Sequence, residues 1–137
     1  MIASAIANGG MCITPRLVSG HKNIIGLPFG ILPSVEFRRF MSDKTANVLT
    51  DAMLDVVNNP EGTGRRAAVA TFPMAMKTGT AGKGAVGYDA VVIGFGPVPN
   101  PRVAFAVFLE HAGKAEFEGA RITRLFLESI QGVTTSF

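Results

Sequence analysis

The chain has 137 residues, of which 47% are hydrophobic, and its mean hydropathy is +0.32. This length suits one domain of ordinary size, and this hydrophobic content excludes a disordered segment. Thirteen Lys and Arg against ten Asp and Glu leave a net charge of only +3, with the cations scattered along the chain, so a nucleic-acid surface is not favoured.

The first predicted element is a helix over residues 1–8, because MIASAIAN is helix-forming and is followed by the stop signal Gly9-Gly10. This helix lacks an N-cap of its own, so we expect that the sequence was cut within a domain. Nothing at the N-terminus resembles a signal peptide. Residues 14–19 are predicted to be extended, and the stretch 20–33 is predicted to be a loop because Gly and Pro punctuate it.

A second helix is predicted after Ser42, which is a suitable N-cap residue. Its apolar stripe follows helical spacing and consists of Leu49, Ala52, Met53 and Val56. The sequence Asn58-Asn59-Pro60 ends this helix, and residues 61–64 form a turn.

Three strands are predicted next, over residues 73–79, 88–96 and 102–110. The connection between the last two is too short for a helical crossover, so they are expected to be antiparallel neighbours. Their apolar runs do not alternate with polar residues, so both faces of the sheet are expected to be covered. A final helix over 118–131 covers one face through Ile122, Leu125, Phe126 and Ile130. For the other face, either the helix at 43–58 covers it or the cover is missing.

These elements predict an α/β fold in the broad sense (α+β), an antiparallel sheet flanked by helices. The longest apolar runs, such as residues 103–109, are too short to span a bilayer. Cys12 cannot form an internal disulfide because it is the only cysteine. The two isolated histidines, His21 and His111, have no metal-site spacing and are expected in loops or on the surface.

The most informative segment is Lys77-Thr78-Gly79-Thr80. A Lys-Thr-Gly triplet alone is a weak signal, since it is also typical of a strand that ends in a glycine turn. Its context is more specific, because further segments occur around it in a fixed order. These segments are Ala7-Asn8-Gly9-Gly10, Thr14 to Val18, Met53 to Val57, Gly62-Thr63-Gly64, Gly94 to Pro97, Pro101 to Val107 and a closing helix after Gly119-Ala120.

In this order the segments resemble the C-terminal part of a penicillin-binding protein transpeptidase domain, over nearly the whole chain (residues 1–137). The resemblance implies an incomplete fold of the penicillin-recognising serine enzymes, which use S-x-x-K, S-x-N and K-T-G motifs. It implies that Lys77 supplies positive charge beside the nucleophile and that Thr78 and Thr80 offer hydroxyl groups to a substrate carboxylate. It also implies that Gly79 lets an extended peptide lie against the strand, and that the Thr80 N–H forms half of the oxyanion hole.

The nucleophile is where the sequence departs from this pattern. No S-x-N triplet occurs, and the one S-x-x-K, Ser19-Gly20-His21-Lys22, lies after the Asn-Gly-Gly segment instead of before it. The glycines and the proline at 20, 26, 28 and 30 also disfavour the helix that this motif needs. We therefore interpret Ser19 as a coincidence and expect the chain alone to be inactive.

The leading hypothesis is a fragment of a peptidoglycan D,D-transpeptidase, and the alternative is a non-catalytic peptide-binding module of the same fold. A third interpretation, a phosphate-binding loop at residues 62–66, lacks the Walker spacing. The resemblance implies stem peptides and β-lactams as ligands, the missing upstream half of the domain as a partner, and no cofactor or metal. It also implies the outer side of the bacterial inner membrane as the location. Loss of the upstream half would expose apolar strand residues, so we expect the chain to self-associate.

Overall fold

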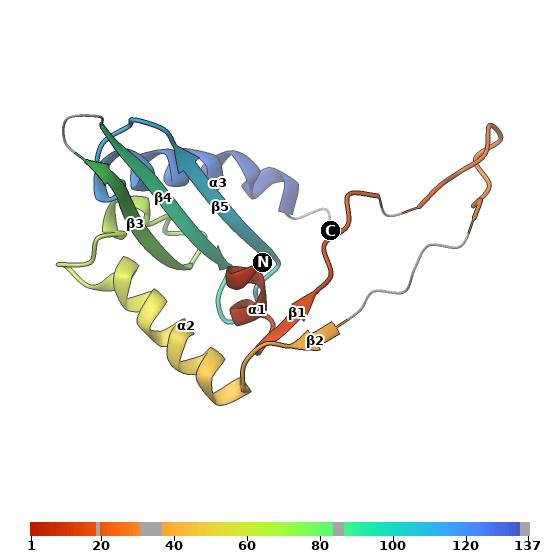
Figure 1. Ribbon diagram of the computed structural model, residues 1–137, viewed down its shortest axis with the longest axis horizontal. Coiled ribbons are helices and arrows are strands. Elements are labelled where there is room, and N and C mark those ends of the chain that lie inside the picture. Colours follow the sequence, from red (N-terminus) through yellow and green to blue (C-terminus); the bar gives the residue numbers. More distant parts are fainter. Residues whose placement is uncertain (19, 31–36, 84–86, 135–137) are drawn as a thin grey trace.

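The computed structural model describes residues 1–18, 20–30, 37–83 and 87–134 (Figure 1). In chain order its elements are α1 (Ile2–Ala7), β1 (Met11–Ile13), β2 (Phe37–Arg39), α2 (Asp43–Asn58), a 3-10 turn (Arg65–Ala67), β3 (Ala75–Lys83), β4 (Gly87–Gly96), β5 (Val103–Leu109), a π-helical turn (Ala115–Gly119) and α3 (Ala120–Thr134). The strands β3, β4 and β5 form one antiparallel sheet in that order, and β1 pairs with β2 in a separate antiparallel ribbon. The predicted α+β architecture is confirmed.

One face of the sheet packs against α3, which lies behind the strands in Figure 1. Met76, Val92 and Phe105 point to this face and form a core with Ala120 and Leu127 of the helix. The predicted contact face of this helix was wrong at Leu125, which is 51% exposed, whereas Ile130 packs against this core and the ring centroid of Phe126 lies 6.3 Å from that of Phe105. Small residues allow the helix to approach the sheet closely, so the buried line follows Ala120, Thr123 and Leu127 instead.

Thr123 can take such a buried position because its hydroxyl group donates to the Gly119 carbonyl at 2.7 Å. The sequence analysis located the buried face of α3 from the spacing of apolar residues alone. Thr123 is polar, so that spacing does not include it, and the predicted face was centred on neighbouring apolar residues instead.

The opposite face of the sheet is covered at one end only. There α1 lies in front of the strands (Figure 1), and Ala3 and Ile6 pack with Met53 of α2 against Ala75 and Phe95. Further along this face, Ala104, Ala106 and Phe108 of β5 are exposed. Of the two alternatives for this face, the missing cover is the one that β5 fits, within the part of the chain that the structure describes.

The helix α2 begins where the sequence predicted, because the Ser42 hydroxyl accepts a hydrogen bond from the Thr45 N–H at 3.1 Å. It ends at Asn58, as predicted from the Asn-Asn-Pro sequence. Its buried residues are Ala46, Met53 and Val57, whereas Ala52 is exposed. The predicted stripe is confirmed at Met53, and Leu49 and Val56 are partly buried and pack against the two cores, so Ala52 is its one member that faces solvent.

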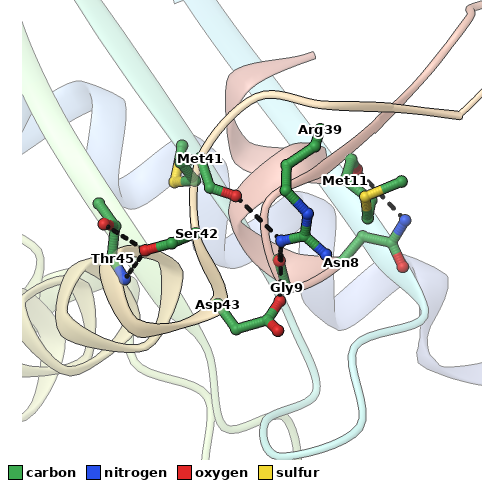
Figure 2. Close-up of polar contacts among 8 residues, drawn as sticks. All are labelled: Asn8, Gly9, Met11, Arg39, Met41, Ser42, Asp43 and Thr45. Carbon is green, nitrogen blue, oxygen red and sulfur yellow. Dashed lines mark hydrogen bonds and ion pairs between the residues drawn. The ribbon is translucent and has the colours of Figure 1, made fainter.

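Arg39 connects α1, β2 and the start of α2, as Figure 2 shows. Its Nη1 donates to the carbonyl oxygens of Gly9 and Met41 at 3.3 and 3.1 Å, and it pairs with Asp43 at 3.1 Å. Gly9 lies just after the C-cap Asn8 of α1, so this bond joins Arg39 to the turn that follows the helix. These contacts join the turn after α1 to the segment that begins α2, beside the apolar packing of Ala3 and Ile6 on the sheet.

Three boundaries differ from the prediction. The first strand is Met11–Ile13, before the segment predicted to be extended, because its partner β2 pairs only with those residues. The strand β3 continues past Gly79 to Lys83, since Ala81, Gly82 and Lys83 remain paired with β4. The final helix continues to Thr134. Among the described residues, no helix is long and apolar enough to cross a membrane.

Candidate functional site

The segment Lys77-Thr78-Gly79-Thr80 lies on β3, at the end of the sheet order. These four residues pair with Ile93, Val92, Val91 and Ala90 of β4, in that order. Within the described residues no strand pairs with the other edge of β3. An open edge of this kind can accept an extended peptide as a further strand, which receives main-chain hydrogen bonds.

Lys77 and Gly79 share the face of the sheet opposite α3, and both are exposed. The Nζ of Lys77 donates to the carbonyl oxygen of Thr78, its chain neighbour. No described carboxylate lies within ion-pair distance of it. This face of the strand therefore presents a cation that is not neutralised by a described acidic side chain.

The two threonines point to the other face and are held by segments from elsewhere in the chain. Thr78 is buried, and its Oγ1 lies 2.6 Å from the Oγ1 of Thr63, in the turn that follows α2. The Oγ1 of Thr80 accepts a hydrogen bond from the Ala115 N–H at 3.0 Å, at the start of the turn before α3. These two contacts fix the strand from Thr78 to Thr80.

Gly79 has no packing reason to be a glycine within the described chain. A Cβ built on it would meet nothing closer than Val91, at 3.9 Å, which is ordinary van der Waals contact. In contrast, a Cβ on Gly94 would lie 2.5 Å from Phe105. A glycine that internal packing does not require is consistent with close approach of a ligand to the backbone.

The turn Gly62-Thr63-Gly64 is a packing feature and not a phosphate-binding loop. A Cβ on Gly62 would lie 2.2 Å from the Val56 carbonyl oxygen, so this position requires glycine. The N–H groups of Gly62 and Gly64 donate to the carbonyl oxygens of Asn59 and Val56, both at 2.9 Å. Donors that are already engaged are not available to a phosphate, and what the turn does instead is bring Thr63 to Thr78.

The sequence predicted Lys77, Thr78, Gly79 and Thr80 as site residues, and the structure places all four on one edge strand. The supporting partners Thr63 and Ala115 were not predicted as such, although Thr63 belongs to a segment that the sequence had singled out. Ser19 lies outside the described residues. His21 and His111 are exposed and lie outside the helices and strands, as predicted. The described residues contain no group of three or more His, Cys, Asp or Glu that could hold a metal ion.

A separate groove of about 810 Å³ lies between α1 and the β1–β2 ribbon, lined mainly by apolar residues including Ile2, Pro15, Phe37 and Phe40. None of the residues 77–80 lines it. Its chemistry is therefore that of a packing surface, unrelated to the polar edge strand.

Comparison with known proteins identifies what this arrangement is similar to. Residues 1–130 match the family model described as the penicillin binding protein transpeptidase domain. The chain is 34% identical over 116 residues to the peptidoglycan D,D-transpeptidase PbpA of Mycolicibacterium smegmatis, covering 82% of this chain and 23% of that protein.

Solved structures give the same result. The crystal structure of the D,D-transpeptidase domain of a peptidoglycan glycosyltransferase from Eggerthella lenta is 32% identical with a TM-score of 0.81, covering 96% of this chain and 31% of that one. Penicillin-binding protein A from M. tuberculosis, in an imipenem acyl-enzyme complex, is 28% identical with a TM-score of 0.77, covering 95% and 29%. The chain thus spans between about a quarter and a third of the length of these proteins.

Proposed function

Because the chain belongs to the penicillin-binding protein transpeptidase family, we propose that it provides the substrate-binding strand of a peptidoglycan D,D-transpeptidase. The observation that carries the proposal is the edge strand β3, which presents Lys77 and Gly79 on an exposed face beside an open edge. A stem peptide or a β-lactam would lie along this edge as an additional strand. Such a ligand agrees with the family. It also agrees with the structure, because Gly79 has no side chain that would block a ligand at this edge.

The side chains of the strand are proposed to have different roles, which follow from their contacts. Lys77 supplies positive charge near the reacting serine and near the substrate carboxylate. Thr80 accepts a hydrogen bond from Ala115 and keeps its own hydroxyl proton, which it can donate to that carboxylate. Thr78 is the weaker donor of the two, because it is buried with its hydroxyl group against Thr63. The Thr80 N–H is the proposed half of the oxyanion hole that stabilises the tetrahedral intermediate of acyl transfer.

The proposal places the serine nucleophile and the S-x-N motif outside these 137 residues, with the other half of the oxyanion hole contributed by the nucleophile's own N–H. The DNA upstream of the codon for Met1 tests this directly. An in-frame reading frame that carries S-x-x-K and then S-x-N supports it. An immediate stop codon contradicts it and favours a chain that acts alone.

The product of that longer reading frame gives the functional test. It is expected to be acylated by penicillin, and the rate of acylation is expected to fall at least about a hundredfold in Lys77→Ala. Lys44→Ala is the matched control, because Lys44 is an exposed lysine on α2 and is expected to leave the rate unchanged. Equal rates in both variants would remove Lys77 from the site.

The isolated chain is expected to form no covalent adduct with penicillin, because the family's acylation requires the missing serine. Intact-mass spectrometry after incubation with penicillin measures this. An adduct that disappears in Ser19→Ala would overturn the assignment of the nucleophile to another segment.

The alternative is a non-catalytic module that uses the same open edge to hold a peptide carboxylate. Binding of a D-Ala-D-Ala peptide by the isolated chain, lost in both Lys77→Ala and Thr80→Ala, would favour it. Absence of binding at millimolar peptide would count against it.

A family of peptidoglycan enzymes implies the cell envelope as the location, and we place the site on the outer side of the inner membrane. For the isolated chain we also propose self-association through uncovered apolar surface.

A further inference from the structure

A hairpin at residues 20–30 is ordered by its own hydrogen bonds, away from the sheet and helices (Figure 1). The N–H of Phe29 donates to the His21 carbonyl at 2.8 Å, and the Asn23 N–H donates to the Leu27 carbonyl at 2.9 Å. The side chain of Asn23 completes the turn, because its Oδ1 accepts from the N–H groups of Ile25 and Leu27. The N–H groups of Asn23, Ile25, Gly26 and Leu27 therefore have acceptors within the turn.

The tip carries several large apolar side chains that are exposed. Ile24 is 104% exposed, Ile25 73%, Leu27 57% and Phe29 69%, so four large apolar side chains stand in water within six residues. None of them belongs to either hydrophobic core. Exposed apolar side chains gathered in this way mark a surface that contacts something else.

The charge around the tip is of one sign. Lys22 lies in the hairpin and Arg16 lies in the segment that leads to it, and both are exposed. The sequence contains no Asp or Glu before Glu36. An apolar tip with cations at its base is complementary to an anionic lipid surface, where the apolar groups enter the interface and the cations meet the phosphates.

We propose that the hairpin at residues 20–30 docks on anionic membranes, with Ile24, Ile25 and Leu27 in the interfacial layer and Lys22 at the headgroups. The internal hydrogen bonds of the turn lower the cost of insertion, because four of its N–H groups already have acceptors in the chain. This proposal uses none of the residues of β3, so its tests and those of the transpeptidase proposal can fail separately.

Flotation with vesicles of phosphatidylglycerol, and separately of phosphatidylcholine, tests the proposal on the whole 137-residue chain. Bound protein rises with the vesicles, whereas self-associated protein does not. We expect flotation with phosphatidylglycerol, weaker flotation with phosphatidylcholine, and a partition coefficient at least about tenfold lower in the double variant Ile24→Ser, Ile25→Ser. Val48→Ser is the matched control, because Val48 is 61% exposed on α2 and is expected to change nothing.

A fluorescent reporter adds a second measurement. The chain has no Trp, so Leu27→Trp places a single indole at the tip, whose emission is expected to shift to shorter wavelength with anionic vesicles. Lys22→Gln is expected to weaken binding to phosphatidylglycerol at low salt. Three results would each overturn the proposal: no flotation with anionic vesicles at low salt, flotation unchanged in the double variant, or a tip that drives protein–protein association while binding no vesicle.

Discussion

Gly79 and Gly94 lie in the same sheet, but their missing side chains face different surroundings. A Cβ on Gly94 would lie 2.5 Å from the Phe105 ring and 2.8 Å from the Ala75 carbonyl oxygen, whereas a Cβ on Gly79 would meet nothing within 3.8 Å. We expect Gly94→Ala to lower the free energy of unfolding by about 1–3 kcal/mol through overpacking. Gly79→Ala is expected to change it by less than about 0.5 kcal/mol.

Thermal or urea unfolding of both variants measures this difference in stability. Measuring ligand binding by the same variants then tests whether Gly79 serves the binding of a ligand. If the strand edge receives a peptide, Gly79→Ala should weaken that binding while stability stays constant, because the methyl group projects from the open face of β3. A Gly79→Ala variant as unstable as Gly94→Ala would show that Gly79 serves packing. Retained ligand binding in Gly79→Ala would instead remove the steric argument for a ligand at this position.

Ser42 is a second residue whose contribution can be isolated. Its hydroxyl group satisfies the Thr45 N–H, one of the donors that the start of α2 leaves without an intrahelical partner. Ser42→Ala is expected to lower the free energy of unfolding by about 1 kcal/mol, and Ser42→Asp is expected to retain most of it. Urea unfolding of the three proteins checks this. Equal losses in both variants would contradict the capping role.

At the scale of elements, Arg39 holds α1 against α2 through three oxygen acceptors from two different segments. Arg39→Ala is expected to raise hydrogen exchange at Gly10 and Met11, because the junction loses its connection to the Gly9 carbonyl. Arg39→Lys is not expected to restore protection, since an ammonium group does not reproduce the planar guanidinium geometry. Full protection in Arg39→Lys would show that charge alone holds the junction.

The sequence predicted which elements exist much better than it predicted the faces they bury. Capping at Ser42, the stop at Asn58 and the antiparallel strands follow from local chemistry, and they are confirmed. The buried face of α3 cannot be predicted from local chemistry in the same way. Thr123 is polar, yet it is buried, because its hydroxyl group is satisfied by a hydrogen bond to the Gly119 carbonyl. Burial of Thr123 depends on how closely the helix meets the sheet, which is a tertiary property.

The site divides in the same way. Lys77 to Thr80 were predicted from the motif and its context, and the structure places them on an edge strand. The contacts from Thr63 and Ala115 join residues that are 15 and 35 positions away from their threonine partners. No local pattern encodes such distances. The hairpin tip was predicted only as a loop, because Gly and Pro signal a turn without indicating which apolar side chains it exposes.

At the scale of the whole molecule, part of one sheet face is apolar and is not covered by any described residue, although α1 covers its other end. Ala104, Ala106 and Phe108 are exposed on one face of β5, and Phe108 is 64% exposed. Within the described residues β5 pairs only with β4, so its outer edge is open as well. An exposed apolar strand at an open edge promotes pairing with another chain, and a charge placed on it opposes that pairing.

We therefore expect the isolated chain to associate reversibly, and Phe108→Lys to lower the association constant at least about tenfold. Sedimentation velocity over a range of concentrations measures it, with Val48→Lys on α2 as the matched control at an exposed apolar position of another element. The Ile24→Ser, Ile25→Ser variant separates this surface from the hairpin, because it is expected to lose vesicle binding while its association is unchanged. A chain that stays monomeric at high concentration would show that the uncovered face of β5 is tolerated in water. Association that Phe108→Lys leaves intact would instead move the contact to another surface.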